Sequence, residues 1–383
     1  MLEEKQIPYI VEKINMRCYG PKPPDFMAKV PTGLLPVLEL DGGPPITESL
    51  RIMVLLEQEF PDHKPLVPRG NSQEVQRWEQ LMRLERRLFS DWLGWACSDW
   101  NQAMGKVRCE ALLDTIEKEL KVAGGPFFFG KDISLADINM VPMFERMVAS
   151  LAYYKGFFIR GTGRWPAIEA WFAALEQRPT YLGTHSDYYQ HCHDLPPQMG
   201  GLYFSDEGYP VAAQIDGMDG QSWRLPLPPL SATSLPEPFS AGDSPPVDTL
   251  EAAASLIKNH EAVARFALRG VGKPGPRPVS APLSDPTAIP ALEHMAAADM
   301  ALRHVAHALL VGVDEKQVSE HALQVTASEP SGPAAELTGM PIIPAAAYLR
   351  DRIGVPRDMR FPAARQLRAH LNWLADSLVA AVA

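Results

Sequence analysis

The sequence predicts an α+β unit at the N-terminus, then an all-helical unit, a proline-rich strap and a helical extension. Three observations lead to this fold class. Short apolar runs broken by turn residues alternate up to about residue 65, and helical spacing of apolar residues dominates after it. Ten prolines lie in residues 195–247, so that stretch is expected to be an extended connector. We therefore expect four units, at residues 1–64, 72–190, 195–247 and 248–383.

Composition limits the functions that the chain can have. Its 383 residues are long for a single core, and the net charge of −10 argues against a nucleic-acid partner. Four cysteines without a CxxC pair are too few for a disulfide framework, which fits a reducing compartment. No apolar run approaches the roughly 20 residues that a membrane span needs, and the charged start "MLEEKQIPYI" does not resemble a signal peptide. We expect a soluble, intracellular protein.

The elements of the first unit follow from spacing and turn residues. In order, they are a strand over Ile7–Met16, a helix over Pro24–Lys29, a hairpin of Leu35–Leu40 with Pro45–Thr47, and a helix over Ser49–Phe60. Pro36 is unexpected in a strand because it has no N–H for the ladder. Either the strand begins after Pro36, or this proline has a separate role.

The second unit is predicted to be helical throughout. Residues 72–100 carry Trp78, Leu81, Leu84, Leu88 and Trp92 on one stripe, and the next helix continues the pattern with Leu112, Ile116 and Leu120. A third helix is predicted to begin in "DISLADINM", where Ser134 occupies the N-cap and Asp137 the N3 position of a capping box.

Four motifs in order give the first 185 residues a resemblance to a known family. "EEKQIPYIVEKIN", "KPPDFMAKVPTGLLPVLELDG", "ITESLRIM" and "GPFFFGKDISLADI" resemble the glutathione transferase family, nearest its cysteine-type omega, lambda and dehydroascorbate-reductase-like members. The resemblance implies a thioredoxin-like N-terminal domain and an all-helical C-terminal domain. It also implies a cis bond before Pro36. A trans proline that starts the strand is the alternative.

The same resemblance implies a glutathione site. The backbone of Leu35, turned outward by Pro36, would pair with the cysteinyl unit of glutathione. Glu48 and Ser49 stand where a strand enters a helix, so the free N–H groups and the helix dipole favour a carboxylate there while Glu48 receives an ammonium group. Glutathione carries both groups on one carbon. Lys29 is a weaker member of the predicted site, and a plain helix-capping role for Ser49 is the alternative.

The catalytic residue cannot be assigned. In the resembling family, the first strand and a catalytic Cys or Ser precede the segment that corresponds to "LEEKQIPY", so the resemblance implies an incomplete thioredoxin-like domain whose first strand is missing. Cys18, Cys97 and Cys109 are expected to be structural or packing residues. An incomplete gene model or a late start codon is one explanation, and a noncatalytic module is the other. A transit peptide would then be hidden, so the expected compartment is the cytoplasm or a plastid.

Two other regions carry no clear functional pattern. "THSDYYQHCHD" gathers metal-capable side chains, but a structural junction is the favoured interpretation and we expect no metal site. Beyond residue 248, helices are predicted over residues 248–270, about 288–311 and 361–383, and nothing indicates their role.

The sequence as a whole predicts a glutathione transferase-like protein. The expected reaction is thiol transfer from glutathione, as co-substrate, to a small-molecule electrophile, or reduction of a disulfide or dehydroascorbate. A homodimer is compatible with the resemblance. The alternative is a noncatalytic scaffold or binding module that keeps the glutathione cleft, so enzymatic activity stays open.

Overall fold

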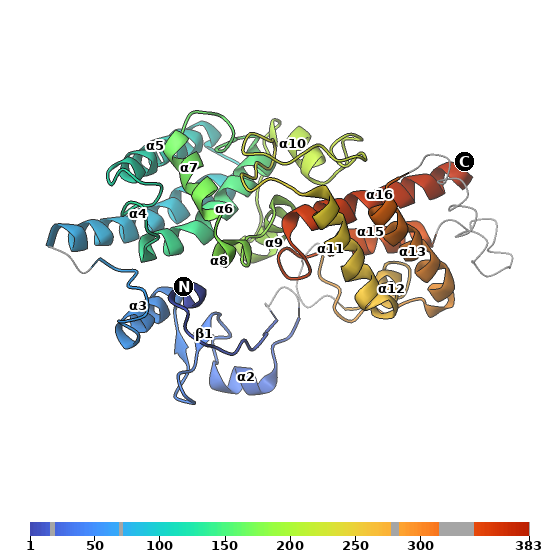
Figure 1. Ribbon diagram of the computed structural model, residues 1–383, viewed down its shortest axis with the longest axis horizontal. Helices are drawn as coiled ribbons and strands as arrows, with labels where there is room; N and C mark the ends of the chain where they lie inside the picture. Colours follow the sequence, from blue (N-terminus) through green and yellow to red (C-terminus); the bar gives the residue numbers. More distant parts are fainter. Residues whose placement is uncertain (16–19, 69–71, 277–282, 314–340, 383) are drawn as a thin grey trace.

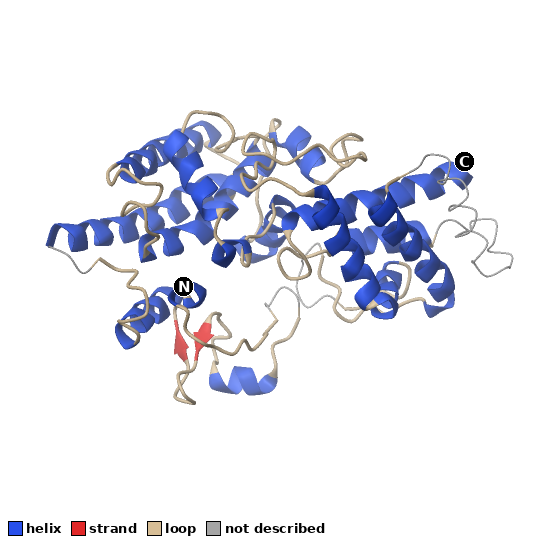
Figure 2. Cartoon of the chain, in the orientation of Figure 1, coloured by secondary structure: helices blue, strands red, loops and turns tan. Residues whose placement is uncertain are grey.

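The protein is described by a computed structural model over residues 1–15, 20–68, 72–276, 283–313 and 341–382. It is mostly helical, with one small two-stranded sheet near the N-terminus (Figure 2). A small α+β part, a helical body and a second helical part follow one another along the chain (Figure 1).

The N-terminal part contains a hairpin and three helices. The helices are α1 (Leu2–Lys5), α2 (Pro24–Lys29) and α3 (Ser49–Glu59), and the strands are β1 (Val37–Leu38) and β2 (Ile46–Thr47). The strands pair antiparallel, with Val37 opposite Thr47 and Leu38 opposite Ile46. The helices predicted over Pro24–Lys29 and Ser49–Phe60 and the hairpin between them are confirmed, although β1 is much shorter than Leu35–Leu40.

The strand predicted over Ile7–Met16 is wrong. Residues 7–15 form no regular element, and Ile10 in their middle is 99 % exposed. A strand needs a neighbour for its ladder groups, and the only sheet in the described part of the chain consists of β1 and β2. Apolar alternation without such a neighbour leaves this stretch irregular. Met16, like Cys18, lies outside the described residues.

The helical body follows the predicted pattern closely. Its helices are α4 (Ser72–Ala96), α5 (Gln102–Lys121), α6 (Leu135–Lys155), α7 (Pro166–Leu175), α8 (Pro179–Leu182) and α9 (Tyr188–Met199). The predicted stripe of α4 is buried at Leu81, Leu84, Leu88 and Trp92. The capping box of α6 is confirmed, because Ser134 holds the N-cap and Asp137 bonds back to it. α4 ends at Ala96 rather than near residue 100.

The strap is not wholly extended, contrary to the expectation for residues 195–247. α9 runs into it as far as Met199, and α10 (Gly208–Ile215) lies within it. Pro210 is tolerated because it stands in the first turn of α10, where the N–H groups have no partner within the helix. The number of prolines in residues 195–247 therefore does not exclude a helix, because their positions within it decide whether they are tolerated.

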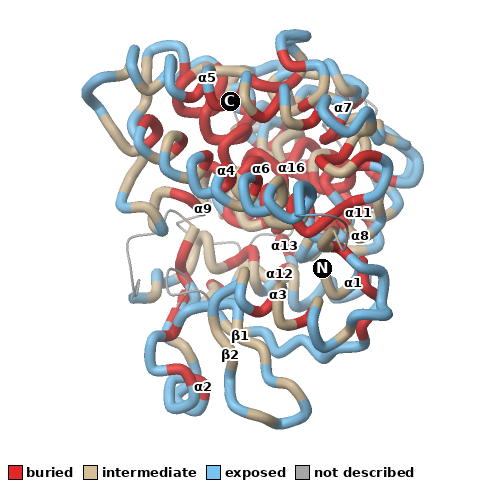
Figure 3. Tube along the Cα trace, turned by 90° about the vertical axis from the view of Figure 1, so that its left-hand side faces the viewer, coloured by how far each residue is buried: buried red, intermediate tan, exposed pale blue. Residues whose placement is uncertain are grey.

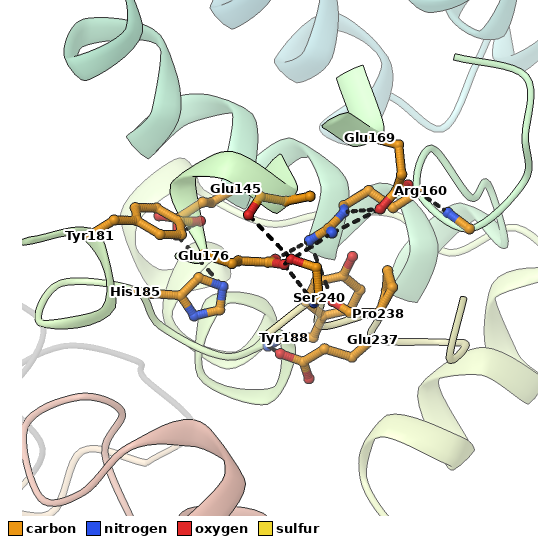
Figure 4. Close-up of polar contacts among 12 residues, drawn as sticks. Glu145, Arg160, Glu169, Glu176, Tyr181, His185, Tyr188, Glu237, Pro238 and Ser240 are labelled. Carbon is orange, nitrogen blue, oxygen red and sulfur yellow. Dashed lines mark hydrogen bonds and ion pairs between the residues drawn. The ribbon is translucent and has the colours of Figure 1, made fainter. Parts of the chain in front are cut away.

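A buried ion cluster fastens the strap to the helical body (Figure 4). Arg160 pairs with Glu176, and it also donates to Glu169 over 2.8 Å. Glu176 in turn accepts a 2.6 Å hydrogen bond from the backbone N–H of Ser240 in the strap, together with one from the Ser240 hydroxyl. The two contacts between Ser240 and Glu176 join residues 64 positions apart, so the strap lies fixed against the body at this point.

The C-terminal part forms a second helical core. Its elements are α11 (Pro245–Lys258), α12 (His260–Ala267), the 3₁₀ turns η2 (Leu268–Gly270) and η3 (Leu292–His294), α13 (Met295–Val311), α15 (Ile342–Arg350) and α16 (Phe361–Val382). The helix predicted over residues 248–270 is broken at Asn259, whose backbone leaves the helical region. The helix predicted to start near residue 288 begins at Met295.

Burial is concentrated in the two helical parts, and the N-terminal part is largely exposed (Figure 3). Its own small core has Ile7, Ile52 and Leu56 as its buried members. Among the described helices, none is both long and apolar enough to cross a membrane.

Candidate functional site

The hairpin register brings four of the five predicted glutathione-binding residues to one end of the sheet. Val37 faces Thr47 in the ladder. In an antiparallel pair the start of β1 and the end of β2 lie at the same end, so Leu35 and Pro36, just before Val37, and Glu48 and Ser49, just after Thr47, lie there. The Leu35–Pro36 bond is cis, as predicted. Leu35 is 42 % exposed, so this residue is accessible from solvent.

Glu48 has an unusual backbone at the junction of β2 and α3. Its φ of 72° lies in the region that favours glycine, and it is the N-cap of α3. Non-glycine residues in such a conformation cost on the order of 1–3 kcal/mol and gather at ligand clamps. Glu48 and Ser49 are both exposed, and Glu48 makes no side-chain capping bond to α3. The junction therefore presents a carboxylate, a hydroxyl and the first N–H groups of a helix to solvent.

Lys29 is placed differently from the other predicted site residues. It is the last residue of α2, and its Nζ lies 3.0 Å from Oε1 of Glu39, just beyond β1. The hydrogen bond and charge of Glu39 raise the pKa of Lys29. This pair ties α2 to the hairpin, so a ligand must compete with Glu39 for the ammonium group.

Glu4 joins the N-terminal part to the helical body, a role that no local sequence pattern indicates. It accepts hydrogen bonds from Arg178 at 2.9 and 2.6 Å and from Lys64 at 2.5 Å, and another from Thr180. Although burial opposes its ionisation, these hydrogen bonds lower the pKa of Glu4 to about 2. The docking of the part that carries the predicted site thus depends on a carboxylate that stays charged.

The described cysteines are poor candidates for a nucleophile. Cys109 and Cys192 are buried and Cys97 is partly buried. Burial raises the pKa of all three thiols, to about 12 for Cys109 and well above the ordinary value for Cys192. A reactive cysteine needs the opposite shift, because the thiolate is the nucleophile. The interpretation of Cys97 and Cys109 as packing residues agrees with this geometry.

A second titratable cluster lies where α6, α8 and α9 meet (Figure 4). Glu145 accepts a 2.7 Å hydrogen bond from the Tyr181 hydroxyl, and its oxygens lie 3.9 Å from His185 Nε2 and 4.0 Å from His191 Nε2. Burial raises the pKa of Glu145 to about 8 and lowers the pKa of His185 to about 4. Glu145 and His185 are therefore largely neutral at pH 7, which suits a structural junction. Within the described residues, no three His, Cys, Asp or Glu side chains converge as metal ligands would.

Comparison with known proteins identifies the family of the first two parts. Residues 1–59 match the glutathione S-transferase N-terminal domain, and residues 75–174 match the glutathione S-transferase C-terminal domain. Glutathione S-transferase DHAR2 of Arabidopsis thaliana is 28 % identical over 159 residues, which are 41 % of this chain and 68 % of that protein.

Two further proteins are similar to part of this chain. Glutathione S-transferase omega-2 of Mus musculus is 26 % identical over 193 residues, covering 49 % of this chain and 72 % of that protein. A solved structure of dehydroascorbate reductase from Chlamydomonas reinhardtii has a TM-score of 0.41 and 21 % identity, and covers 52 % of this chain and 86 % of that one. Residues 1–59 and 75–174 of this chain therefore form a glutathione S-transferase N-terminal domain and a glutathione S-transferase C-terminal domain.

Proposed function

We propose that the junction of β2 and α3 binds the γ-glutamyl end of glutathione. The observation that carries this proposal is the exposed Glu48 with its left-handed backbone beside Ser49, at the same end of the hairpin as Leu35 and Pro36. The α-carboxylate of the ligand would accept hydrogen bonds from the Ser49 hydroxyl and backbone N–H, and its ammonium group would pair with Glu48. The backbone of Leu35 would pair with the cysteinyl unit in the manner of an added strand.

The proposed activity is glutathione-dependent thiol chemistry. In one form, the glutathione thiolate attacks an electrophilic carbon, a C–S bond forms and the leaving group departs. In the other, two glutathione molecules supply two electrons to a disulfide or to dehydroascorbate and leave as glutathione disulfide. The family membership and the names of the relatives support this proposal. Glutathione itself supplies the reacting thiol in either form.

A noncatalytic glutathione-binding module is the second candidate. The raised thiol pKa values of Cys97, Cys109 and Cys192 favour it, because none of these three would assist the chemistry as a thiolate at neutral pH. The two candidates share the same ligand site and differ only in turnover.

Calorimetric titration with glutathione tests the site. Ser49→Ala and Glu48→Gln should each weaken binding by about 1–3 kcal/mol, the range for a charge-assisted hydrogen bond. Ser72→Ala, the same change at the exposed first residue of α4, and Glu59→Gln, at the exposed last residue of α3, are matched controls that should leave the affinity unchanged. Equal affinity in all four variants would overturn the assignment.

Assays of conjugation and of disulfide or dehydroascorbate reduction then separate the two candidates. Turnover that falls in parallel with binding in Ser49→Ala supports the enzyme. Binding without turnover supports the module.

A further inference from the structure

α11 carries two apolar faces, and one of them is open to solvent. The covered face packs against α13 and α16 (Figure 1) and is buried at Ala252, Ala253 and Leu256. The open face, which we call the α11 stripe, consists of Val247, Leu250, Ala254 and Ile257. Its three larger side chains are 53, 58 and 55 % exposed in chain order, and Ala254 is exposed as well.

The spacing of the α11 stripe is that of a seam between two helices. Its members are three, four and three residues apart, which places them on one narrow face of the helix. The same spacing defines the a and d positions of a coiled coil. Single exposed apolar residues are ordinary on a protein surface, but this row extends along almost the whole of α11. The pattern indicates a helix as the partner of this face.

The α11 stripe is complementary to a second copy of itself in the antiparallel orientation. Val247 and Ile257 are each five positions from Ala252, and Leu250 and Ala254 are each two positions from it. A two-fold axis at Ala252 therefore sets Val247 against Ile257 of the second copy and Leu250 against Ala254 of the second copy. A large side chain then faces a small one, and every contact occurs twice, as a two-fold interface requires. A parallel pair would instead set Leu250 against Leu250 and Ala254 against Ala254, which leaves a gap.

The charges beside the α11 stripe agree with this orientation. Glu251 and Lys258 each follow a stripe residue directly and lie on the same flank of the helix. Antiparallel pairing brings Lys258 of each copy beside Glu251 of the other. Lys258 is exposed and forms no ion pair with the described residues, whereas Glu251 and Asp248 share the guanidinium of Arg360. Two carboxylates around one guanidinium leave room for a second cation, and opposed helix dipoles favour the same orientation.

We propose that two copies of this chain form a homodimer through antiparallel packing of their α11 stripes. α11 lies outside residues 1–59 and 75–174, so this interface belongs to the C-terminal part and does not rest on the proposed glutathione site. One helix from each copy buries less than the roughly 800 Å² per partner of a standard interface. A dissociation constant in the micromolar range is therefore expected.

Sedimentation velocity of the full chain between about 1 and 100 µM measures the association. The wild type should change from monomer to dimer over this range. Leu250→Glu and Ile257→Glu each place a charge against an apolar face and should raise the dissociation constant about tenfold or more. Val107→Glu, the matched control on α5, changes a valine that is 59 % exposed and should leave the dimer unchanged. Lys258→Glu should weaken the dimer by less than the two stripe variants, because its pair lies at the rim.

Disulfide cross-linking tests the orientation. A mixture of Leu250→Cys chains and Ala254→Cys chains should give a cross-linked dimer on oxidation, because antiparallel packing sets these two positions together. Leu250→Cys chains alone should not cross-link, because the two copies of position 250 are then too far apart for a disulfide. The wild type, oxidised in the same way, is the control for the native cysteines.

Four results would overturn the proposal. The first two are a wild type that stays monomeric at about 100 µM, and a dimer that both Leu250→Glu and Ile257→Glu leave intact. The third is a dimer that Val107→Glu dissociates, which would place the contact on α5. The fourth is efficient cross-linking of Leu250→Cys chains alone, which would show a parallel pair.

Discussion

At the scale of single residues, Glu145 sets a pH dependence that can be measured. Its pKa is about 8 in the folded chain because it is buried, with a side chain 12 % exposed. The unfolded chain loses this proton near pH 4.5, the ordinary value. Between these two values the folded state holds more protons, so the Glu145 contribution to stability falls as pH rises.

Glu145→Gln should remove this loss of stability at higher pH, because an amide cannot ionise. The amide oxygen can still accept a hydrogen bond from the Tyr181 hydroxyl. Urea unfolding at pH 5, 6.5 and 8 measures the unfolding free energy of both proteins. The value for the variant should rise relative to that of the wild type as pH increases. His185 acts in the other direction, because its pKa of about 4 makes stability fall as pH drops below about 6.5. If the unfolding free energies of the wild type and Glu145→Gln change in parallel with pH, this account is contradicted. Glu59→Gln, at an exposed glutamate, is the control.

Residue roles could be predicted only where a local pattern defines them. Pro36 stood out because a proline conflicts with a strand ladder, and its bond is cis. Glu4 and Glu145 gave no signal, because their partners Arg178 and Tyr181 are brought near only by the tertiary fold. Burial and partners separated in sequence decide the charge of such residues.

At the scale of elements, the start of α6 depends on the capping box. Asp137 is fully buried and accepts from Ser134, from the Phe128 N–H at 3.1 Å and from the Trp171 indole at 2.8 Å. Asp137→Ala leaves buried donors unpaired at about 1–3 kcal/mol each, so the unfolding free energy should fall by more than about 3 kcal/mol.

Ser134→Ala removes only the N-cap side chain and should cost about 1 kcal/mol. Chemical denaturation of both variants, with Ser72→Ala at an exposed helix start as the control, measures these changes. Similar losses for Asp137→Ala and Ser134→Ala would show that the Asp137 network adds nothing to the cap.

Helices were predicted far better than strands. Stripes such as Leu81, Leu84 and Leu88 specify a helix by themselves, since a helix makes its own hydrogen bonds. A strand depends on a neighbour, so the apolar alternation of residues 7–15 could not show whether a ladder forms. The break at Asn259 was missed because "IKNHEA" continues an amphipathic pattern on both sides of it.

At the scale of the whole molecule, the part that carries the predicted site is held less firmly than the helical body. Its own core has few buried apolar residues, and Glu4 docks it through polar contacts to Arg178 and Thr180. Amide exchange should therefore be faster in residues 1–64 than in α4–α6, and Glu4→Gln should speed it further. Mass-spectrometric exchange measures both. Uniform protection across the chain would contradict this prediction.

The C-terminal part could be predicted to be helical but could not be placed. Its attachment depends on Arg368 of α16 pairing with Asp187, 181 positions earlier, and on the strap between them. No local pattern specifies a contact of that sequence separation.

A crystal structure of the full chain with bound glutathione tests the central claim most directly. The account predicts that the γ-glutamyl carboxylate accepts hydrogen bonds from the Ser49 hydroxyl and backbone N–H, and that its ammonium group pairs with Glu48. The backbone of the cysteinyl unit should pair with the backbone of Leu35. Glutathione bound elsewhere on the chain, with Glu48 and Ser49 still open to solvent, would contradict it.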